Sequence, residues 1–215
     1  AIGLLPSDYW RYYLLANAPE TSDASFTWDG FAGTVNKDLA DILGNFVNRT
    51  LKFCSSKFGN SLPEGGSFGA AEAALAKSLT ERLEAYNTHM ADMQIRKAMQ
   101  ELRAIWALGN EYLTEAAPWT AFKTDPEAAA QSLRVAVNLI RLFAILSAPV
   151  IPETAAKMAA ALGLSLSQTD WIERDMETEL QTLKAGHGFD IPEVLFRKLS
   201  DAEVAEWETR FGGRD

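Results

Sequence analysis

The feature that most constrains this sequence is a long stretch, residues 126–148, that is apolar on nearly every side. Its interior is polar chiefly along Arg134, Asn138 and Arg141, whose steps of four and three residues place them on one face of a helix. A helix that is hydrophobic almost all round must be covered by other elements. We therefore expect it at the centre of a helical bundle. Because the polar residues interrupt the apolar run, the stretch does not resemble a membrane span.

The rest of the chain also has helical spacing and contains no convincing strand. Proline and glycine residues mark the breaks between helices, most clearly between residues 59 and 66. Further helices are expected over residues 8–15, 27–58, 70–86, 92–116, 153–162 and from 201 onward. The sequence thus predicts an all-α fold: a helical bundle of about five main helices, with a short helical lead-in and a C-terminal tail packed back on it.

Helix starts are marked by residues that can cap the first backbone N–H groups. We expect Ser7, Thr27 and Thr124 to be such caps, the last followed by an early helical proline. Ser200 and Glu203 have the spacing of a capping box. The terminal helix that they open should bury Val204 and Trp207.

Three segments are expected along the chain. Residues 1–24 would be the end of a linker region, residues 25–169 the helical domain, and residues 170–215 the tail with its terminal helix. The tail is the most acidic segment, with 12 acids against 6 bases. We find no internal repeat.

Composition excludes several kinds of site. The chain has one cysteine, so no internal disulfide can form, and with only two histidines a Cys/His zinc site is excluded. Cys54 falls on the apolar stripe of its helix and is expected to be buried and inert. His89 and His187 are isolated, and we expect solvated or structural roles for both. No signal peptide is recognised at the start, and a reducing cytoplasm is expected.

The net charge of −9 argues against diffuse binding to nucleic acid. The charge is uneven, however. Residues 36–58 carry four basic and two acidic side chains, a local excess of +2. Any contact with RNA would have to be local and specific.

One set of polar and aromatic residues has chemistry suited to reading RNA. Asn45 and Arg49 lie one helical turn apart, opposite the apolar stripe, so both can face one object. Asn can read a base edge, Arg can bind an edge or a phosphate, and Trp119 can stack on an unpaired base. Spacing alone also allows a plainer interpretation, in which Asn45 and Arg49 are ordinary exposed helix residues and Trp119 packs at a helix end.

Four motifs in this order resemble the C-terminal region of bacterial methionyl-tRNA synthetases, and the resemblance runs nearly end to end. Residues 8–15 (DYWRYYLL) resemble the family's helix just past its KMSKS loop. Residues 36–49 (NKDLADILGNFVNR) resemble its long anticodon-domain helix, residues 116–119 (AAPW) its Pro-Trp segment, and residues 195–199 (LFRKL) its closing motif.

The resemblance implies roles for specific residues. Asn45, Arg49 and Trp119 match the positions with which the family recognises the CAU anticodon. Three neighbours have weaker claims to RNA contact: Asn48, Lys52 and Pro118. The residues up to Leu15 would end the stem-contact region, which joins the catalytic and anticodon domains.

The resemblance also implies what this chain lacks. The family's catalytic core, its HIGH-type and KMSKS motifs and its zinc-binding insertion are absent, so the chain resembles a fragment of a larger protein. The parent activity would be methionine–tRNA ligase, with ATP and zinc in the catalytic part. We expect no cofactor, metal or catalytic residue here, and an inactive chain on its own. Its partners would be methionine tRNA and the catalytic domain. Because the sequence ends at residue 215 without the family's added C-terminal module, we expect a monomer.

Two alternatives remain at this point. The first is the helical domain of another class I synthetase, such as the cysteinyl or leucyl enzyme, which the Pro118-Trp119 segment in register with Asn45 and Arg49 disfavours. The second is a helical protein-interaction module without RNA binding, which would show an exposed apolar patch. The net charge of −9 is the best argument for the second.

Overall fold

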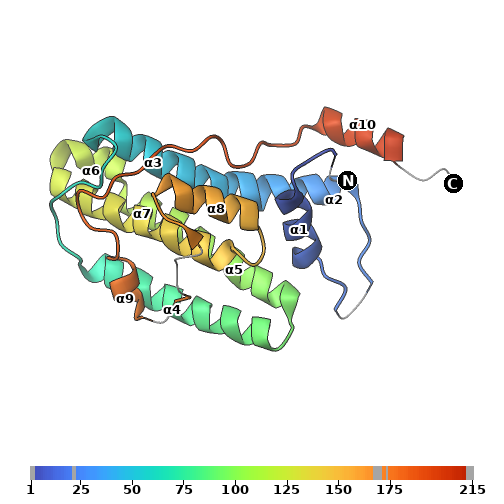
Figure 1. Cartoon of the computed structure of the whole chain (residues 1–215), viewed down its shortest axis with the longest axis horizontal. Helices are drawn as coiled ribbons and strands as arrows, with labels where there is room; N and C mark the ends of the chain where they lie inside the picture. The colour runs from blue at the N-terminus through green and yellow to red at the C-terminus, as the bar shows by residue number, and fades with distance from the viewer. Residues whose placement is uncertain (1–2, 21–22, 167–170, 173, 212–215) are drawn as a thin grey trace.

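The computed structural model describes residues 3–20, 23–166, 171–172 and 174–211. Figure 1 shows a bundle of helices along which the C-terminal tail runs back. In the described part of the chain there are helices but no strands, only an isolated bridge between Ser61 and Gly188. The all-α prediction is therefore confirmed. The predicted boundary between residues 169 and 170 lies outside the described residues.

The lead-in helix α1 (Ser7–Ala16) is fastened to a helix far along the chain. Ser7 does not cap α1 as expected, because it is already the first helical residue and its hydroxyl donates to Glu153 at 3.1 Å. Asp8 is buried and accepts the N–H of Thr154 at 2.7 Å. This contact caps the start of α8 (Pro152–Ala161), so the lead-in and α8 stabilise each other.

A single long helix follows, and its middle has an unexpected geometry. It comprises α2 (Trp28–Thr34), the π-helical segment η1 (Val35–Gly44) and α3 (Asn45–Phe58). Thr27 caps its start as predicted, accepting the N–H of Gly30 at 3.0 Å. At the end of η1 the N–H of Asn45 reaches back five residues to the carbonyl of Ala40. Gly59, with φ of 80°, ends the helix.

Asp38 of η1 joins the long helix to two others. Its carboxylate is almost fully buried and accepts from the Tyr12 hydroxyl of α1 at 3.0 Å and from Arg103 at 2.6 Å. Arg103 belongs to α5 (Ile95–Ala116). Burial, followed by the charge of Asp38, raises the pKa of Tyr12 well above its usual value. The hydroxyl therefore stays protonated and donates to Asp38.

Helices α4 (Ala70–Ala91) and α5 pack along each other, and α5 also packs on the central helix. The core face of α5 is formed by the buried side chains of Met99, Leu102, Trp106 and Leu113, whereas Ile95 is only partly buried. A short helix that the sequence did not predict, α6 (Pro118–Thr124), follows α5 directly. Pro118 lies just beyond the end of α5, and it is also the first residue of the next helix.

The central helix is α7 (Pro126–Ser147), as the sequence predicted. Its cap is Asp125, whose side chain accepts the N–H of Ala128 at 3.0 Å, and not Thr124, which ends α6. By length and composition α7 is the one candidate membrane span among the described residues, but 94% of its most apolar window is buried inside the bundle. Such burial is typical of the core helix of a folded bundle.

Two asparagines hold the tail to the bundle by pairing with one backbone residue each. The Asn138 amide donates to the carbonyl of Leu183 at 3.0 Å and accepts its N–H at 2.7 Å. Asn36 makes the same pair of bonds with Leu199, both at 2.8 Å. Each side-chain amide thus replaces a backbone partner that the irregular tail lacks.

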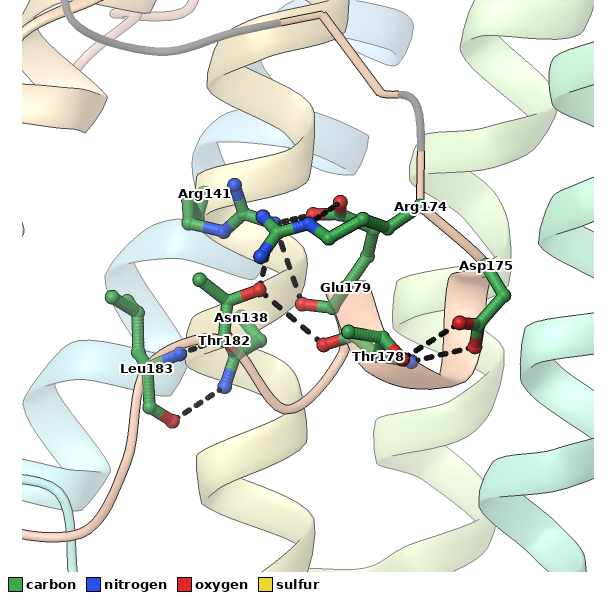
Figure 2. A network of polar contacts seen from close by, with 8 residues as sticks. All are labelled: Asn138, Arg141, Arg174, Asp175, Thr178, Glu179, Thr182 and Leu183. Carbon is green, nitrogen blue, oxygen red and sulfur yellow. Dashed lines mark hydrogen bonds and ion pairs between the residues drawn. The ribbon is translucent and has the colours of Figure 1, made fainter.

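Each of these two pairings is an asparagine clamp. The Asn138–Leu183 clamp belongs to a larger polar network (Figure 2). Glu179, in the short helix α9 (Met176–Glu179), pairs with Arg141 of α7 and with Arg174, the latter at 2.8 Å. Glu179 and Arg141 are both almost fully buried. Because each buried charge is paired, removing one partner would leave the other uncompensated.

The terminal helix α10 (Asp201–Phe211) docks on α2, as the expected inner face predicted. Val204 and Trp207 are buried, and the ring of Trp207 lies 5.2 Å from that of Trp28. The capping box is present: Ser200 and Glu203 exchange hydrogen bonds, and the bond from the Ser200 N–H is the main cause that lowers the pKa of Glu203.

Candidate nucleic-acid interface

The first two turns of α3 expose the polar residues that the sequence singled out. Asn45 and Arg49 are exposed, while Phe46, Val47 and Thr50 of the same turns are buried. The helix is amphipathic, so burying one side fixes the other toward solvent. Asn45 and Arg49 therefore share an open face, one turn apart, as their spacing predicted.

Trp119 reaches this face from α6. The chain turns sharply between α5 and α6 at Ala117, whose backbone is left-handed (φ of 39°, ψ of 57°). Pro118 is buried and starts α6, which leaves Trp119 partly exposed in the first turn. The position of Trp119 is thus set by a backbone turn that costs a non-glycine residue about 1–3 kcal/mol.

The structure brings Arg49 and Trp119 into direct contact. The guanidinium carbon of Arg49 lies 4.6 Å from the centroid of the indole, over the ring. Phe53, one turn further along α3, meets the same indole edge-on at 6.4 Å. Asn45 lies one turn before Arg49 on the exposed side. The residues that were expected to act together therefore lie along neighbouring turns of α3 and the start of α6.

The weaker candidates differ in accessibility. Lys52 is exposed one turn beyond Arg49, and Asn48 is partly buried. Pro118 is buried beneath the corner between α5 and α6, so its side chain packs rather than faces solvent. Their roles in RNA contact stay predictions.

Beyond Trp119, a second pair of an aromatic ring and a cation was missed by the sequence reasoning. The ammonium of Lys57 lies 5.5 Å from the ring centroid of Phe122, which Phe58 meets edge-on at 5.3 Å. Phe53, on the same side of α3, is only partly buried. A signal was present, because Phe122 follows Trp119 by three residues and so lies near it on α6.

The two acidic residues of η1 are already in ion pairs, whereas, in the described part of the chain, the basic residues of α3 are not. Asp38 pairs with Arg103, and Asp41 pairs with Lys198 at 2.7 Å. Among the described residues no ion pair includes the three basic side chains of α3, which are Arg49, Lys52 and Lys57. The face of α3 is therefore positive even though the whole chain is acidic.

No catalytic constellation is found elsewhere in the described residues. Burial raises the pKa of the Cys54 thiol to about 12, so it remains protonated and unreactive near neutral pH. His187 bonds the carbonyl of Leu162 at 2.8 Å and His89 bonds Gln94 at 3.1 Å, which are structural contacts. No cluster of three or more His, Cys, Asp or Glu side chains in this part of the chain could hold a metal ion.

A cavity of about 540 Å³ lies away from the Arg49–Trp119 face, between the loop at residues 64–68, α7 and the tail. The guanidinium of Arg134 borders it but is bonded to the carbonyl of Pro63 at 2.7 Å. Burial lowers the pKa of Arg134. Because the Arg134 guanidinium is already hydrogen-bonded to the backbone of the loop, it is not free to bind a ligand in the cavity. The α3 face is therefore the better candidate site.

Comparison with protein families gives two matches that together cover all of the chain except residues 52–61. A family described as the anticodon binding domain of methionyl tRNA ligase matches residues 62–215. A second, described as class I tRNA synthetases (M), matches residues 1–51.

Curated relatives and solved structures agree with these matches. The methionine–tRNA ligases of Ruegeria pomeroyi and Paracoccus denitrificans are 56% and 54% identical to this chain over 99% of its length, but the chain spans only 37% of each. The methionyl-tRNA synthetase of Mycobacterium tuberculosis in its free state superposes with a TM-score of 0.80 at 26% identity, covering 93% of this chain and 40% of that one. Its complex with methionyl-adenylate gives a TM-score of 0.78 over 91% and 38% of the two chains.

Proposed function

Because the chain belongs to the methionyl-tRNA ligase family and carries its anticodon-binding domain, we propose that it binds methionine tRNA and recognises the CAU anticodon. The observation that carries this proposal is the contact of Arg49 with Trp119 on the exposed, positive face of α3. A ring and a guanidinium placed together at the surface suit an unpaired base, which needs a stacking partner and hydrogen-bond donors.

In the proposed mechanism the residues have separate tasks. Trp119 stacks on an anticodon base that has left the loop's own stack. In the structure without RNA, the Arg49 guanidinium covers the indole. When a base stacks on the indole instead, Arg49 moves to a base edge or a phosphate. Asn45, one turn away, accepts from and donates to the edge of a neighbouring base. Lys52 supplies charge for the RNA backbone, and Pro118 supports the indole from below.

The bundle acts as a rigid frame for these contacts. Trp119 is held by the α5–α6 corner, and Arg49 by a helix whose opposite side is buried in the core. Neither side chain depends on a long flexible loop, so little ordering has to accompany binding.

The parent activity is the attachment of methionine to its tRNA with ATP, in the cytoplasm. We propose that the catalytic domain of the same enzyme, with its ATP and zinc sites, performs that chemistry, and that this chain alone is inactive and monomeric. The chain spans only 37% of the length of its relative from Ruegeria pomeroyi, which supports a separate catalytic part. The lead-in up to Leu15, which lies within the match to the synthetase family itself, would face the catalytic domain.

The test is binding of this chain to an anticodon stem-loop with CAU and to the same hairpin with an altered triplet, at fixed salt. We expect tighter binding to CAU. Trp119→Ala should weaken CAU binding by about 5- to 150-fold, the range found when a base loses an aromatic stacking partner. Arg49→Lys keeps the charge but removes the planar donor group, so it should reduce the preference for CAU.

Lys37→Ala is the matched control, because Lys37 is an exposed cation on the same long helix, three turns before Arg49. It should leave the preference for CAU unchanged. Equal binding of the wild-type chain to both triplets would overturn the proposed function. Equal binding by wild type and Trp119→Ala would remove Trp119 from the site.

A further inference from the structure

The aromatic surface does not end at Trp119. Phe53 meets the Trp119 ring edge-on at 6.4 Å and the Phe122 ring edge-on at 6.5 Å. Phe53 thus links the two rings into one row along α6 and the second half of α3. Each outer ring of this row has a basic residue of α3 over it: Arg49 over Trp119, and Lys57 over Phe122.

The row is long enough for more than one nucleotide. Arg49 and Lys57 are eight residues apart on α3, which corresponds to about 12 Å along the helix axis. Stacked nucleotides of one strand are spaced by roughly 3.4 Å. Lys52 is exposed between the two, so positive charge continues along the whole row.

The ring of Phe122 is partly exposed, and Lys57 lies over it. Lys57 is exposed and forms no ion pair among the described residues, so its ammonium is hydrated. Phe122 itself is only partly buried, although Phe58 packs on it. A lysine side chain is flexible, so Lys57 can leave the ring for a phosphate and expose the face beneath.

From this geometry we propose that Phe122 and Lys57 form a further nucleotide subsite, which holds one anticodon-loop nucleotide outside the triplet. The inference rests on the proposed function. Phe122 stacks on the base and Lys57 binds a phosphate next to it. Because an aromatic ring accepts any base face, the subsite strengthens binding without reading sequence. It therefore adds affinity to CAU and to altered triplets alike.

The experiment compares Phe122→Leu and Lys57→Ala with the wild-type chain, using the CAU and altered hairpins. Phe122→Leu should weaken binding to both hairpins by a similar factor of about 5 or more, because stacking on the ring is lost. Lys57→Ala should lower the slope of log affinity against log salt by about 0.7, the value for one phosphate contact on a single strand.

Abasic hairpins identify the nucleotide. Removing the base at one loop position outside the triplet should weaken binding to the wild-type chain by the same factor as Phe122→Leu. The same hairpin should show no further loss with the Phe122→Leu variant, since both changes delete one contact. Independent, additive losses at every loop position would overturn the subsite.

The controls separate this inference from the proposed function. The control pair is Arg210 and Phe211 on α10, in which the guanidinium lies 5.0 Å from the ring centroid. Helix α10 lies at the opposite end of the molecule from α6 (Figure 1). Arg210→Ala and Phe211→Leu should therefore leave binding to both hairpins unchanged. Circular dichroism checks that every variant keeps its helices. If the wild-type chain prefers CAU but Phe122→Leu binds as tightly as wild type, the subsite alone is overturned. If the wild-type chain has no triplet preference, both proposals are overturned.

Discussion

Gly109 lies where α5 packs tightly against α3 and α7. A Cβ placed there would lie 2.9 Å from ring carbons of both Phe46 on α3 and Phe143 on α7. The two rings are fully buried, with their centroids 5.2 Å apart. Both phenyl rings are rigid and closely packed by other core side chains, so neither ring can move away from a new Cβ unless its helix also moves. The missing side chain of Gly109 therefore sets how closely α5 approaches the helix that carries Asn45 and Arg49.

We predict that Gly109→Ala lowers the free energy of unfolding by about 1–3 kcal/mol, because the overpacking exceeds the gain in helix propensity. Urea denaturation measures the change. Gly33→Ala is the control, since Gly33 is exposed in α2 and a Cβ there would have no atom within 4 Å. It should raise stability by about 0.5–1 kcal/mol. A loss of stability at Gly33, or none at Gly109, would contradict this account.

At the same scale, spacing could predict which side of α3 is exposed but not what faces it. Asn45 and Arg49 are four residues apart, and that local relation survives in the structure. The contact of Arg49 with Trp119 depends on the left-handed turn at Ala117, a conformation that alanine does not signal in a sequence. Only the family resemblance connected the two. Lys57 and Phe122 had no such guide and were missed.

At the scale of elements, the two asparagine clamps explain how a weakly periodic tail can be held in place. Asn138 holds Leu183 and Asn36 holds Leu199, each through a pair of bonds to one residue's backbone. Such pairing needs no repeating apolar pattern. For this reason the tail's position could be predicted only as generally packed back, and its anchors could not.

We predict that Asn138→Ala releases the segment around Leu183 while the bundle stays folded, because the buried N–H and carbonyl of Leu183 lose their partners. Each unpaired group costs about 1–3 kcal/mol. Hydrogen exchange should show faster exchange of the Leu183 amide, with that of Leu199 unchanged.

Asn36→Ala is the reciprocal test, expected to expose the Leu199 amide and leave that of Leu183 protected. If either change accelerated both amides together, the tail would be one cooperative unit, and the two clamps would not be independent.

Helix boundaries were predictable where proline or glycine forces them, as at Gly59 and Pro126. Two elements were not. Helix α6 was overlooked because Pro118 both follows one helix and begins another. The π-helical segment η1 was overlooked because apolar residues at three- and four-residue steps suit an ordinary α-helix equally well.

At the scale of the whole molecule, the charge is divided between surfaces. The net charge of the chain is −9. The two acids of η1 are nevertheless neutralised by ion pairs with Arg103 and Lys198. The basic residues of α3 form no ion pair among the described residues. An acidic protein with a local positive face repels RNA in general and attracts it at that face.

We predict that binding to the CAU hairpin depends only modestly on salt. If Arg49, Lys52 and Lys57 each bind one phosphate, the slope is near 2, and affinity falls roughly 20-fold between 50 and 200 mM salt. Titrations at several salt concentrations measure this slope. Homopolymer RNA should bind much more weakly throughout. A much steeper slope, or strong homopolymer binding, would show a broad electrostatic surface instead of a local one.

The π-helical segment Val35–Gly44 gives the long helix a place where its length can change. In an ordinary α-helix, the deletion of one residue rotates everything downstream by about 100° about the helix axis. A deletion within α3 before Phe46 would therefore turn Arg49 away from Trp119 and Phe46 out of the core. Within Val35–Gly44 the wide turns can instead tighten into α-helix, which absorbs the loss and keeps the downstream side chains in place. The segment therefore acts as a length adjuster between the lead-in and the RNA-facing surface.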